Sequence, residues 1–429
     1  MSRNTSMDPP VFQFKAAAGE IRTYRFLTYV FGGGVKVNSE VDKHERFFDE
    51  RTPVRAASIR GQLRFWWRAC NPSGCTTLQE LRQKEGEIWG TTSRPSQVTV
   101  EVVRNLPKPA GVRVYEYNER GGLVAPKVLA PLAYAAFPLQ PDRDARAQRT
   151  AAGVLFDYGK NTFDLKLTYL DSLKEDVQTA LWAWETFGGL GARTRRGFGA
   201  VQRVSPTPEQ AEVDIEAKLR GLETNPRIAG VPSLSGARYD RSPESHLRSL
   251  DAWKEGLAHL QRLRQGVKVG RNTSSFGKPA GRSYWPEPDE IRRLTRESSP
   301  RHRRPATDVR AFPRAAFGLP IIFHFQTSRH EPDTLGEPED SQLKPAGEKV
   351  DRFASPLILR PVPSGQRYFL GALALHSPLP EVVLQHSGGT EPVVCSLSTG
   401  DAGQLTVMRD SKGILHTDPI ARFFAEIKK

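Results

Sequence analysis

The sequence predicts an α+β protein whose elements follow the βαββαβ order of ferredoxin-like, RNA-recognition-like domains. Two observations support this fold class. In the first half, strand-like and helix-like segments alternate in the order strand, helix, strands, helix, glycine-rich loop and strand. At 429 residues the chain is long for one domain, so two domains with a core each are expected. The proline-rich stretch 205–209 suggests a joint, which gives an N-terminal domain over 1–204 and a C-terminal domain over 205–429.

The first predicted strand covers 20–30, where β-forming and polar residues alternate, and the glycines of 31–35 end it. Apolar residues at helical spacing in SIRGQLRFWWRAC predict a helix over 58–70. Further strands are predicted over 97–104, 112–117 and 163–170.

The second helix of this half is expected to begin in a capping box, because Ser172 and Glu175 have the S-x-x-E spacing. Apolar residues continue its period to Phe187, and Gly188 ends it. After the glycine-rich loop, a short apolar strand is predicted over 200–204.

In the second half, Ser242 and Pro243 are typical of a helix start and are followed by apolar residues at helical spacing. Asp418 and Pro419 open a last helix in the same way. Strands are predicted over 319–326, 355–360 and 368–375. The segment 328–350 is polar, partly acidic and rich in proline and glycine, so we expect a mobile polar insertion there.

Composition points to a polyanionic partner. The chain has 62 Lys and Arg against 48 Asp and Glu, a net charge of +14, and arginine suits phosphate recognition. The three cysteines, Cys70, Cys75 and Cys395, have neither the spacing of a zinc site nor that of a disulfide framework. No apolar run is long enough to span a membrane and no secretory leader is visible, so we expect a cytoplasmic protein.

The glycine-rich loop GGLGARTRRGFGAV is the strongest functional signal. Its glycines, among them Gly189, Gly191 and Gly197, permit positive φ angles and let main-chain N–H groups approach a phosphate or ribose. The loop arginines add charge and planar donors; they are Arg193, Arg195 and Arg196. The loop has neither the Walker nor the dinucleotide-binding pattern, so nucleotide hydrolysis is disfavoured. RNA or DNA contact is predicted, the alternative being a plain turn with its arginines in solvent.

The helix over 58–70 carries a second basic feature. Arg60, Arg64 and Arg68 lie at i, i+4 and i+8, where like charges repel by about 0.2–0.5 kcal/mol per pair, and no acidic residue shares their stripe. Trp67 beside them could stack on a base. The alternative is that the tryptophans lie in the core and the arginines are exposed or pair with carboxylates elsewhere.

Basic residues also occur in the second half. Arg282 follows a glycine in a basic loop, and Arg301, Arg303 and Arg304 form a compact cationic run. RNA contact is one interpretation of both. The other is that the run is solvated and that nearby Asp289 and Glu290 simply cap a helix.

Five motifs together resemble a known family. They are SIRGQLRFWWRA at 58–69, GLGARTRRGFGAV at 189–201, GRSYWPEPDEIR at 281–292, FPRAAFGLPIIF at 312–323 and RFASPLILRP at 352–361. They resemble the first-numbered subunit of the Cmr complex, the type III-B CRISPR effector, within the RAMP superfamily. The resemblance covers nearly the whole chain.

This resemblance implies two ferredoxin-like RAMP domains in tandem and a subunit that holds the 3′ part of the guide (crRNA). It also implies contact with the paired target RNA and with neighbouring Cmr subunits, in antiviral defence. RNA-binding roles carry over to Arg60, Arg64, Trp67 and Arg68, to the loop 188–199, and to Arg282 and Arg314. No catalytic residue, metal or cofactor is expected.

Three other classes of function have less support from the sequence. A RAMP-fold, metal-independent endoribonuclease that processes CRISPR transcripts would use a histidine near the first helix, and His44 lies in that stretch. A metal nuclease is disfavoured because no paired carboxylates accompany the basic elements. A spacer that contacts only protein is disfavoured by the arginine stripe on the helix over 58–70.

Overall fold

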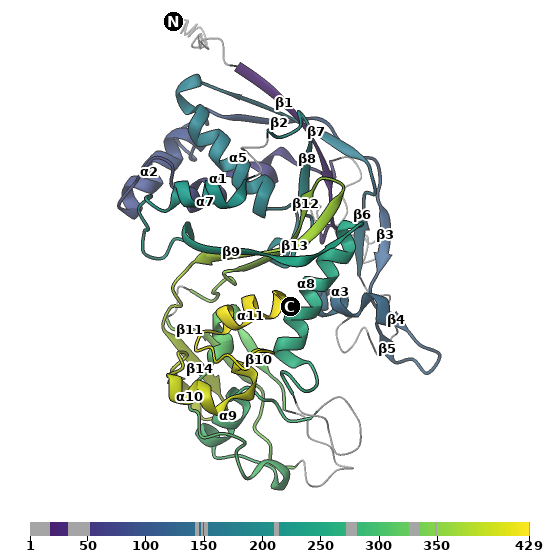
Figure 1. Ribbon diagram of the computed structural model, residues 1–429, viewed down its shortest axis with the longest axis vertical. Helices are drawn as coiled ribbons and strands as arrows, with labels where there is room; N and C mark the ends of the chain where they lie inside the picture. Colours follow the sequence, from purple (N-terminus) through teal and green to yellow (C-terminus); the bar gives the residue numbers. More distant parts are fainter. Residues whose placement is uncertain are drawn as a thin grey trace, which may run out of the picture.

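The first half of the chain forms one antiparallel sheet with helices against one face (Figure 1). The computed structural model describes residues 18–32, 52–141, 146, 149, 153–209, 214–271, 281–325, 335–347 and 350–428. The main elements of this half are β1 (Ala18–Phe26), α1 (Ala56–Cys70), α2 (Leu78–Trp89), β2 (Thr99–Arg104), β7 (Thr162–Tyr169), α5 (Lys174–Phe187) and β8 (Val201–Ser205). The sheet order is β2-β7-β1-β8, with every neighbouring pair antiparallel. That is the order of a split βαβ unit.

Alternation along β7 explains how the sheet covers the helices. Its buried side chains, Phe163, Leu165, Leu167 and Tyr169, alternate with half-buried ones, so one face of the strand lies in the core. α1 and α5 pack together against that core, to which α1 contributes Ile59, Leu63, Trp66 and Trp67. The two predicted helices of the first half and its strands over 20–30, 97–104, 163–170 and 200–204 are therefore present with small shifts of their ends. The strand predicted over 112–117 is instead divided between two short strands, Ala110–Arg113 and Glu116–Tyr117.

A long connection between β2 and β7 carries small elements toward the second half. They are β3 (Ala110–Arg113), β4 (Glu116–Tyr117), β5 (Leu123–Val124), α3 (Ala130–Ala135) and β6 (Val154–Asp157), with short 3-10 turns at Lys127–Leu129 and Phe137–Leu139. β3 pairs with β6 and β4 with β5. α3 packs against a helix of the second half, so this connection joins the two halves.

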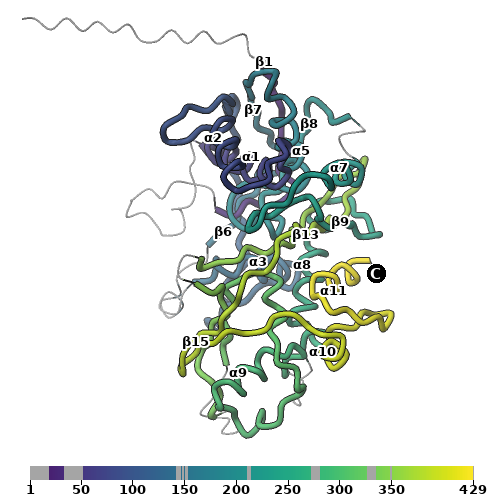
Figure 2. Tube along the Cα trace, turned by 90° about the vertical axis from the view of Figure 1, so that its left-hand side faces the viewer, coloured from purple at the N-terminus to yellow at the C-terminus, as the bar shows by residue number. Residues whose placement is uncertain are grey.

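The second half begins with a three-stranded sheet of order β12-β13-β9. Its elements are α7 (Ile215–Leu222), β9 (Ser233–His246), α8 (Ser249–Gln265), β12 (Leu357–Ser364), β13 (Arg367–His376) and α11 (Pro419–Ile427). This sheet lies in the middle of the molecule, with α1 and α5 on one side and α8 and α11 on the other (Figures 1 and 2). Because both faces are covered, β12 begins with five consecutive buried residues.

A second sheet, of order β10-β11-β14-β15, closes the far end of the molecule with a small core of its own. The elements there are α9 (Glu287–Thr295), β10 (Ile321–Phe323), β11 (Ser341–Pro345), β14 (Val382–His386), β15 (Gly389–Pro392) and α10 (Thr399–Gln404). Figure 2 shows α9, α10 and β15 at the end of the molecule opposite α1, α2 and α5.

Two predicted helix starts are wrong. Ser172 and Glu175 form no capping box, because a 3-10 turn at Asp171–Leu173 precedes α5 and makes Leu173 the N-cap residue, which has no side-chain cap hydrogen bond. Ser242 and Pro243 lie inside β9 rather than at a helix start. β9 is an edge strand, where a proline costs no ladder hydrogen bond, and α8 begins only at Ser249.

The segment 328–350 is also corrected where it is described. Residues 341–345 form β11, which pairs with β10 on one side and β14 on the other. Its side chains alternate between buried and half-buried, with Leu343 fully buried. Glu337 lies in an ion-pair network with Arg292 and His302. The polar composition of this stretch therefore reflects an edge of the core and its ion pairs rather than an insertion throughout.

Candidate nucleic-acid interface

The glycine-rich loop runs from the end of α5 into β8, as the sequence predicts, and its backbone is packed against protein. Gly197 and Gly199 have positive φ angles of 81° and 62°. A Cβ on Gly197 would lie 2.5 Å from the carbonyl oxygen of Leu359, and one on Gly199 would overlap the carbonyl oxygen of Leu190. Both positions therefore require glycine for internal packing.

The other predicted cradle glycines have the same explanation. A Cβ on Gly189 would lie 2.7 Å from the carbonyl oxygen of Gly199, and one on Gly191 would lie 2.8 Å from that of Phe31. Among the predicted cradle glycines only Gly191 is exposed, and its φ is 89°. The interpretation of Gly189 and Gly197 as a phosphate cradle is therefore corrected: the main chain of the second half and of the loop itself fills the space beside them.

Two of the three loop arginines join the halves of the molecule. The guanidinium of Arg195 donates to the carbonyl oxygen of Ser355, and that of Arg196 donates to the carbonyls of Leu357 at 3.1 Å and Phe317 at 3.3 Å. Each guanidinium has five N–H donors, so these bonds leave others available. Both side chains are half-buried.

Arg193 differs from the other two. It precedes the 3-10 turn Thr194–Arg196 in a left-handed conformation, with a φ of 57°. Its guanidinium carbon lies 4.5 Å from the ring centroid of Phe137, just after α3. Phe137 is 57% exposed, so this pair lies at the surface.

Arg264 of α8 completes a group of cations. Its guanidinium donates to the hydroxyl of Tyr134 at 3.2 Å, and its charge acts on Arg196 together with those of Arg193 and Arg195. We call Arg193, Arg195, Arg196 and Arg264 the junction cluster. Within the described part of the chain, none of the four forms an ion pair with a carboxylate.

The electrostatics of the junction cluster reflect this missing counter-charge. Burial lowers the pKa of Arg195 to about 10. Burial also lowers the pKa of Arg196 to about 10, and the neighbouring arginines add to the effect. The pKa of Arg193 is lowered as well, mainly by burial. All remain cations near neutral pH, but the cluster would be stabilised by an incoming anion.

The arginines of α1 have a partner that the spacing of residues along that helix does not reveal. Glu85 of α2 is buried, and one of its oxygens accepts hydrogen bonds from Arg64 Nε at 2.7 Å and from Arg68 Nη1. Arg60 is exposed. The prediction that no acidic residue relieves this stripe is therefore wrong, because the carboxylate comes from another helix.

Trp67 cannot serve as the predicted stacking surface. Its side chain is fully buried, and its Nε1 donates to Asp176 at 2.7 Å. The alternative that the tryptophans of α1 belong to the core is correct for both Trp66 and Trp67. Phe65 lies nearer the surface, with its ring 5.5 Å from the guanidinium carbon of Arg195, so α1 and the loop do lie side by side.

Arg282 and Arg314 of the second half are held in ion pairs. Arg282 Nη2 lies 2.7 Å from Asp289, and Arg314 Nε lies 3.1 Å from the buried Glu287. These ion pairs hold α9 and the turn Pro313–Phe317 in place. The RNA-binding role predicted for the two arginines is therefore replaced by a structural one. The acidic residues at the start of α9 therefore do more than cap it.

The run Arg301, Arg303 and Arg304 lies in and after the 3-10 turn Pro300–His302, with all three side chains exposed. Its neighbour His302 bonds to the buried Glu337 at 2.7 Å. The turn is thereby anchored, while the arginines stay at the surface. Their RNA contact stays a prediction.

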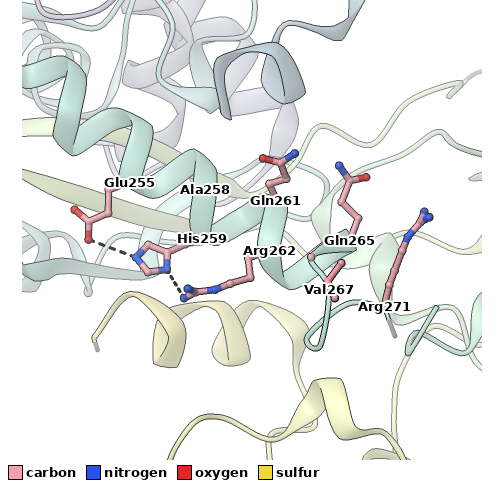
Figure 3. Close-up of a pocket in the computed structure, with 9 residues that line it drawn as sticks. Glu255, Ala258, His259, Gln261, Arg262, Gln265, Val267 and Arg271 are labelled. Carbon is pink, nitrogen blue, oxygen red and sulfur yellow. Dashed lines mark hydrogen bonds and ion pairs between the residues drawn. The ribbon is translucent and has the colours of Figure 1, made fainter. Parts of the chain in front are cut away.

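An open cleft of about 660 Å³ runs along α8 (Figure 3). Figure 3 shows Glu255, His259 and Arg262 in a row on the side toward α11, with Arg271 at the other end. Glu255 pairs with His246 at 2.8 Å and with His259 at 3.4 Å. Arg262 pairs with the buried Glu426 of α11. Carboxylates thus neutralise this row.

The described residues offer one group with the composition of a metal site, Glu244, His246 and Glu255, whose ligand atoms lie within 4.8 Å of one another. The ion pair between His246 and Glu255 accounts for it without a metal. His44, the residue of the endoribonuclease alternative, lies outside the described residues. No helix within the described ranges is long and apolar enough to cross a membrane.

Comparison with known proteins shows a likeness to one family over part of the chain. Residues 23–202 match the family model of the RAMP superfamily. This part of the chain is therefore similar to the RAMP superfamily. It is also 26% identical, over 165 residues, to CRISPR system Cmr subunit Cmr1-1 of Pyrococcus furiosus. That match covers 38% of this chain and 44% of the length of Cmr1-1, and it confirms the resemblance predicted from the motifs.

Two solved structures are similar to this chain over most of its length. Apo Cmr1 from Pyrococcus furiosus matches with a TM-score of 0.44 and 16% identity, over 84% of this chain and 88% of that one. A chain of the type III-B Cmr-beta complex bound to cognate target RNA matches with a TM-score of 0.42 and 11% identity, over 96% and 99%.

Phe137, Tyr134 and Arg264 escaped prediction from the sequence. Each lies in or just after α3 or α8, which are distant from the loop in the sequence and reach it only in the folded protein. No motif includes them, and the sequence offers no local signal that they meet Arg193 and Arg196.

Proposed function

We propose that this protein is a non-catalytic, RNA-binding, Cmr1-like subunit of a type III-B CRISPR effector. The likeness of residues 23–202 to the RAMP superfamily and the similarity to Cmr1-1 support membership. Following the family resemblance, it would hold the 3′ part of the crRNA, contact paired target RNA and dock on other Cmr subunits. It would do so in the cytoplasm, in antiviral defence.

The observation that carries RNA binding is the junction cluster. Four guanidinium groups lie together, half-buried, with no carboxylate paired to them in the described residues. Burying charge without a counter-charge is costly, and phosphate oxygens accept bidentate hydrogen bonds from guanidinium. A phosphodiester backbone would therefore find both charge and donors there. The exposed Arg60 of α1 and Arg82 of α2, the helix that carries Glu85, would extend the positive surface.

The second half fits a shortened form of the same fold. β9, α8, β12, β13 and α11 follow the order of the first five elements of a βαββαβ domain, and β13 lies between β12 and β9. We infer two RAMP-type units in tandem, the second without a fourth strand among the described residues.

In this proposal the protein positions RNA and does not cut it. No side chain of the junction cluster is a general base at neutral pH, since arginine stays protonated. Sequence would be read by pairing between crRNA and target. No cofactor or metal is needed for these roles.

The test is a titration of fluorescently labelled single-stranded RNA with purified protein, by anisotropy, at several salt concentrations. Changing Arg193 and Arg264 together to glutamine should weaken binding about tenfold or more, and should flatten the salt dependence by about 0.7 log unit for each phosphate that is no longer neutralised. The matched control is Arg220→Gln, an exposed arginine of α7 that removes the same type of charge outside the cluster.

Equal affinity and an equal salt slope in the double variant and wild type would contradict the proposal. Gel analysis of the RNA, with and without chelator, tests the non-catalytic part. Intact RNA is expected, whereas cutting that His44→Ala abolishes would favour the endoribonuclease.

A further inference from the structure

Phe137 is an aromatic side chain with an unusual position. Among the exposed large apolar side chains of the described residues it is the only phenylalanine or tryptophan, with 57% of its surface exposed. It opens the turn Phe137–Leu139, whose backbone is fixed by hydrogen bonds from Leu139 N–H to Ala136 and from Gln140 N–H to Phe137, at 2.9 and 3.0 Å. An exposed phenylalanine on a fixed turn is available to a ligand.

Arg193 lies against this ring and belongs to the junction cluster. Its guanidinium carbon is 4.5 Å from the ring centroid, within the range of a cation–π contact. The guanidinium can cover only one face of the ring. The exposure of Phe137 shows that much of the remaining surface is open to solvent.

The backbone of Arg193 is held in place rather than mobile. Its left-handed φ of 57° is unfavourable for a residue with a Cβ, although the same loop uses glycine at other positive φ positions. Hydrogen bonds fix it on both sides, from Ala192 N–H to Phe31 O at 2.7 Å and from Arg196 N–H to Arg193 O at 2.8 Å. The fold therefore keeps an arginine in a strained conformation beside an exposed aromatic ring.

We propose that Phe137 and Arg193 bind one unpaired nucleobase of single-stranded RNA. The base stacks on the open surface of the Phe137 ring, and Arg193 contacts the adjoining phosphate. This inference rests on the proposed RNA-binding function and adds to it the position at which a base is held. It replaces the stacking role predicted for Trp67, which is buried.

The positive charge around the Phe137 ring favours single-stranded RNA over an apolar protein segment as the ligand. Arg193 lies against the ring, and neither it nor the rest of the junction cluster has a paired carboxylate among the described residues. A docking protein segment would have to bring acidic groups as well as an apolar one. Single-stranded RNA carries both features in every nucleotide, a phosphate and a base with two π faces.

The experiment uses single-stranded RNA oligonucleotides with 2-aminopurine at successive positions, whose fluorescence falls on stacking. Binding of the wild-type protein should strongly quench the fluorescence of 2-aminopurine at one of these positions. Phe137→Leu, which keeps an apolar side chain without the ring, should lose that quenching and bind about fivefold more weakly. Phe137→Trp should retain both. Because Phe137 is exposed, these variants should fold, and Val128→Ala, also exposed, is the matched control.

An oligonucleotide that is abasic at the quenched position separates stacking from other effects. Wild type and Phe137→Leu should bind it with equal affinity. If wild type binds RNA and the Arg193 and Arg264 double variant does not, but Phe137→Leu matches wild type in affinity and quenching, this inference is overturned while the proposed function stands. Loss of binding to a protein subunit by Phe137→Leu, with RNA binding unchanged, would equally overturn it. Failure of wild type to bind RNA would instead contradict the proposed function.

Discussion

The arginines of α1 and those of the junction cluster look alike in the sequence and differ in their surroundings. Arg64 and Arg68 share one buried carboxylate, Glu85, contributed by α2. The loop arginines and Arg264 have main-chain carbonyls, an aromatic ring and a tyrosine hydroxyl around them. Carbonyls satisfy donors without cancelling charge, so the two regions have similar numbers of arginines and different electrostatic potentials. The partner, more than the arginine, determines which surface is available to an anion.

The two regions also differ in the role of glycine, and this gives the prediction of largest effect. Gly199→Ala should destabilise the protein by about 3 kcal/mol or more, because its Cβ would overlap the carbonyl oxygen of Leu190 at a positive φ. Gly61→Ala, in the interior of α1 with nothing within 4 Å of its Cβ, should stabilise by about 0.5–1 kcal/mol. Urea unfolding of both variants measures the difference. Equal stability of Gly199→Ala and wild type would mean that the loop backbone is not locked.

Removing the counter-charge of α1 tests the comparison directly. Glu85→Gln should lower the free energy of unfolding by about 2 kcal/mol, because two charge-assisted hydrogen bonds to a buried carboxylate are weakened. It should also raise affinity for single-stranded RNA at low salt, since Arg64 and Arg68 lose their neutralising partner. The control is Glu87→Gln, the same change on the same helix, where the partners Lys84 and Arg94 are exposed and stability should barely change. An unchanged RNA affinity in Glu85→Gln would place α1 outside the RNA path.

The same contrast explains what could be predicted from the sequence. α1, α5 and the strands of the first sheet follow from apolar periodicity, which is a local property. The capping box of α2 was present as Thr77 and Glu80, and it could have revealed that helix. Glu85, the carboxylate on that helix, is 17 to 21 residues from Arg68 and Arg64 along the chain. No local sequence pattern shows that these residues meet in space.

The candidate site shows the same limit. The loop was found because its glycines and arginines are adjacent in the chain, but its glycines serve packing against Leu359 and Leu190. The exposure of Phe137 and the burial of Trp67 depend on how the halves meet, and helical spacing alone placed Trp67 on the wrong face. Strand β9 escaped prediction because an edge strand tolerates Pro243 and polar residues.

Within the loop, the comparison can be sharpened by exchanging arginine for lysine. Arg196→Lys should destabilise by about 1–2 kcal/mol, because one ammonium group cannot reach the carbonyls of Leu357 and Phe317 together as the guanidinium fork does. Arg193→Lys should change stability by less than about 0.5 kcal/mol, since its contact with Phe137 is a surface cation–π pair. Thermal or urea unfolding compares the two. Equal losses would mean that Arg196 does not join the halves.

α8 carries both a paired and an unpaired arginine, and a change beside the paired one is expected to have the smallest effect on stability of those predicted here. Arg262 pairs with Glu426, whereas Arg264 has no carboxylate partner in the described chain. Beside Arg262, burial alone would lower the pKa of His259, but its bonds to Glu255 and Glu426 outweigh burial and raise it above the ordinary value near 6.5. A raised pKa means that the folded state holds the proton more tightly. The stabilising contribution is therefore complete below pH 6.5 and is lost as the pH rises through the folded pKa.

His259→Gln should therefore be less stable than wild type at pH 5.5, by about 1 kcal/mol at most, and the difference should shrink at pH 8.5. The pKa of Glu255 is lowered overall, because its bonds to His259 and His246 outweigh burial, so its carboxylate stays ionised across this range. Urea unfolding at the two pH values measures the change. RNA affinity should not follow it, because this network already contains its own carboxylates. A parallel loss of RNA binding in His259→Gln would show that the paired and the unpaired arginines of α8 act as one surface, and the distinction between them would fail there.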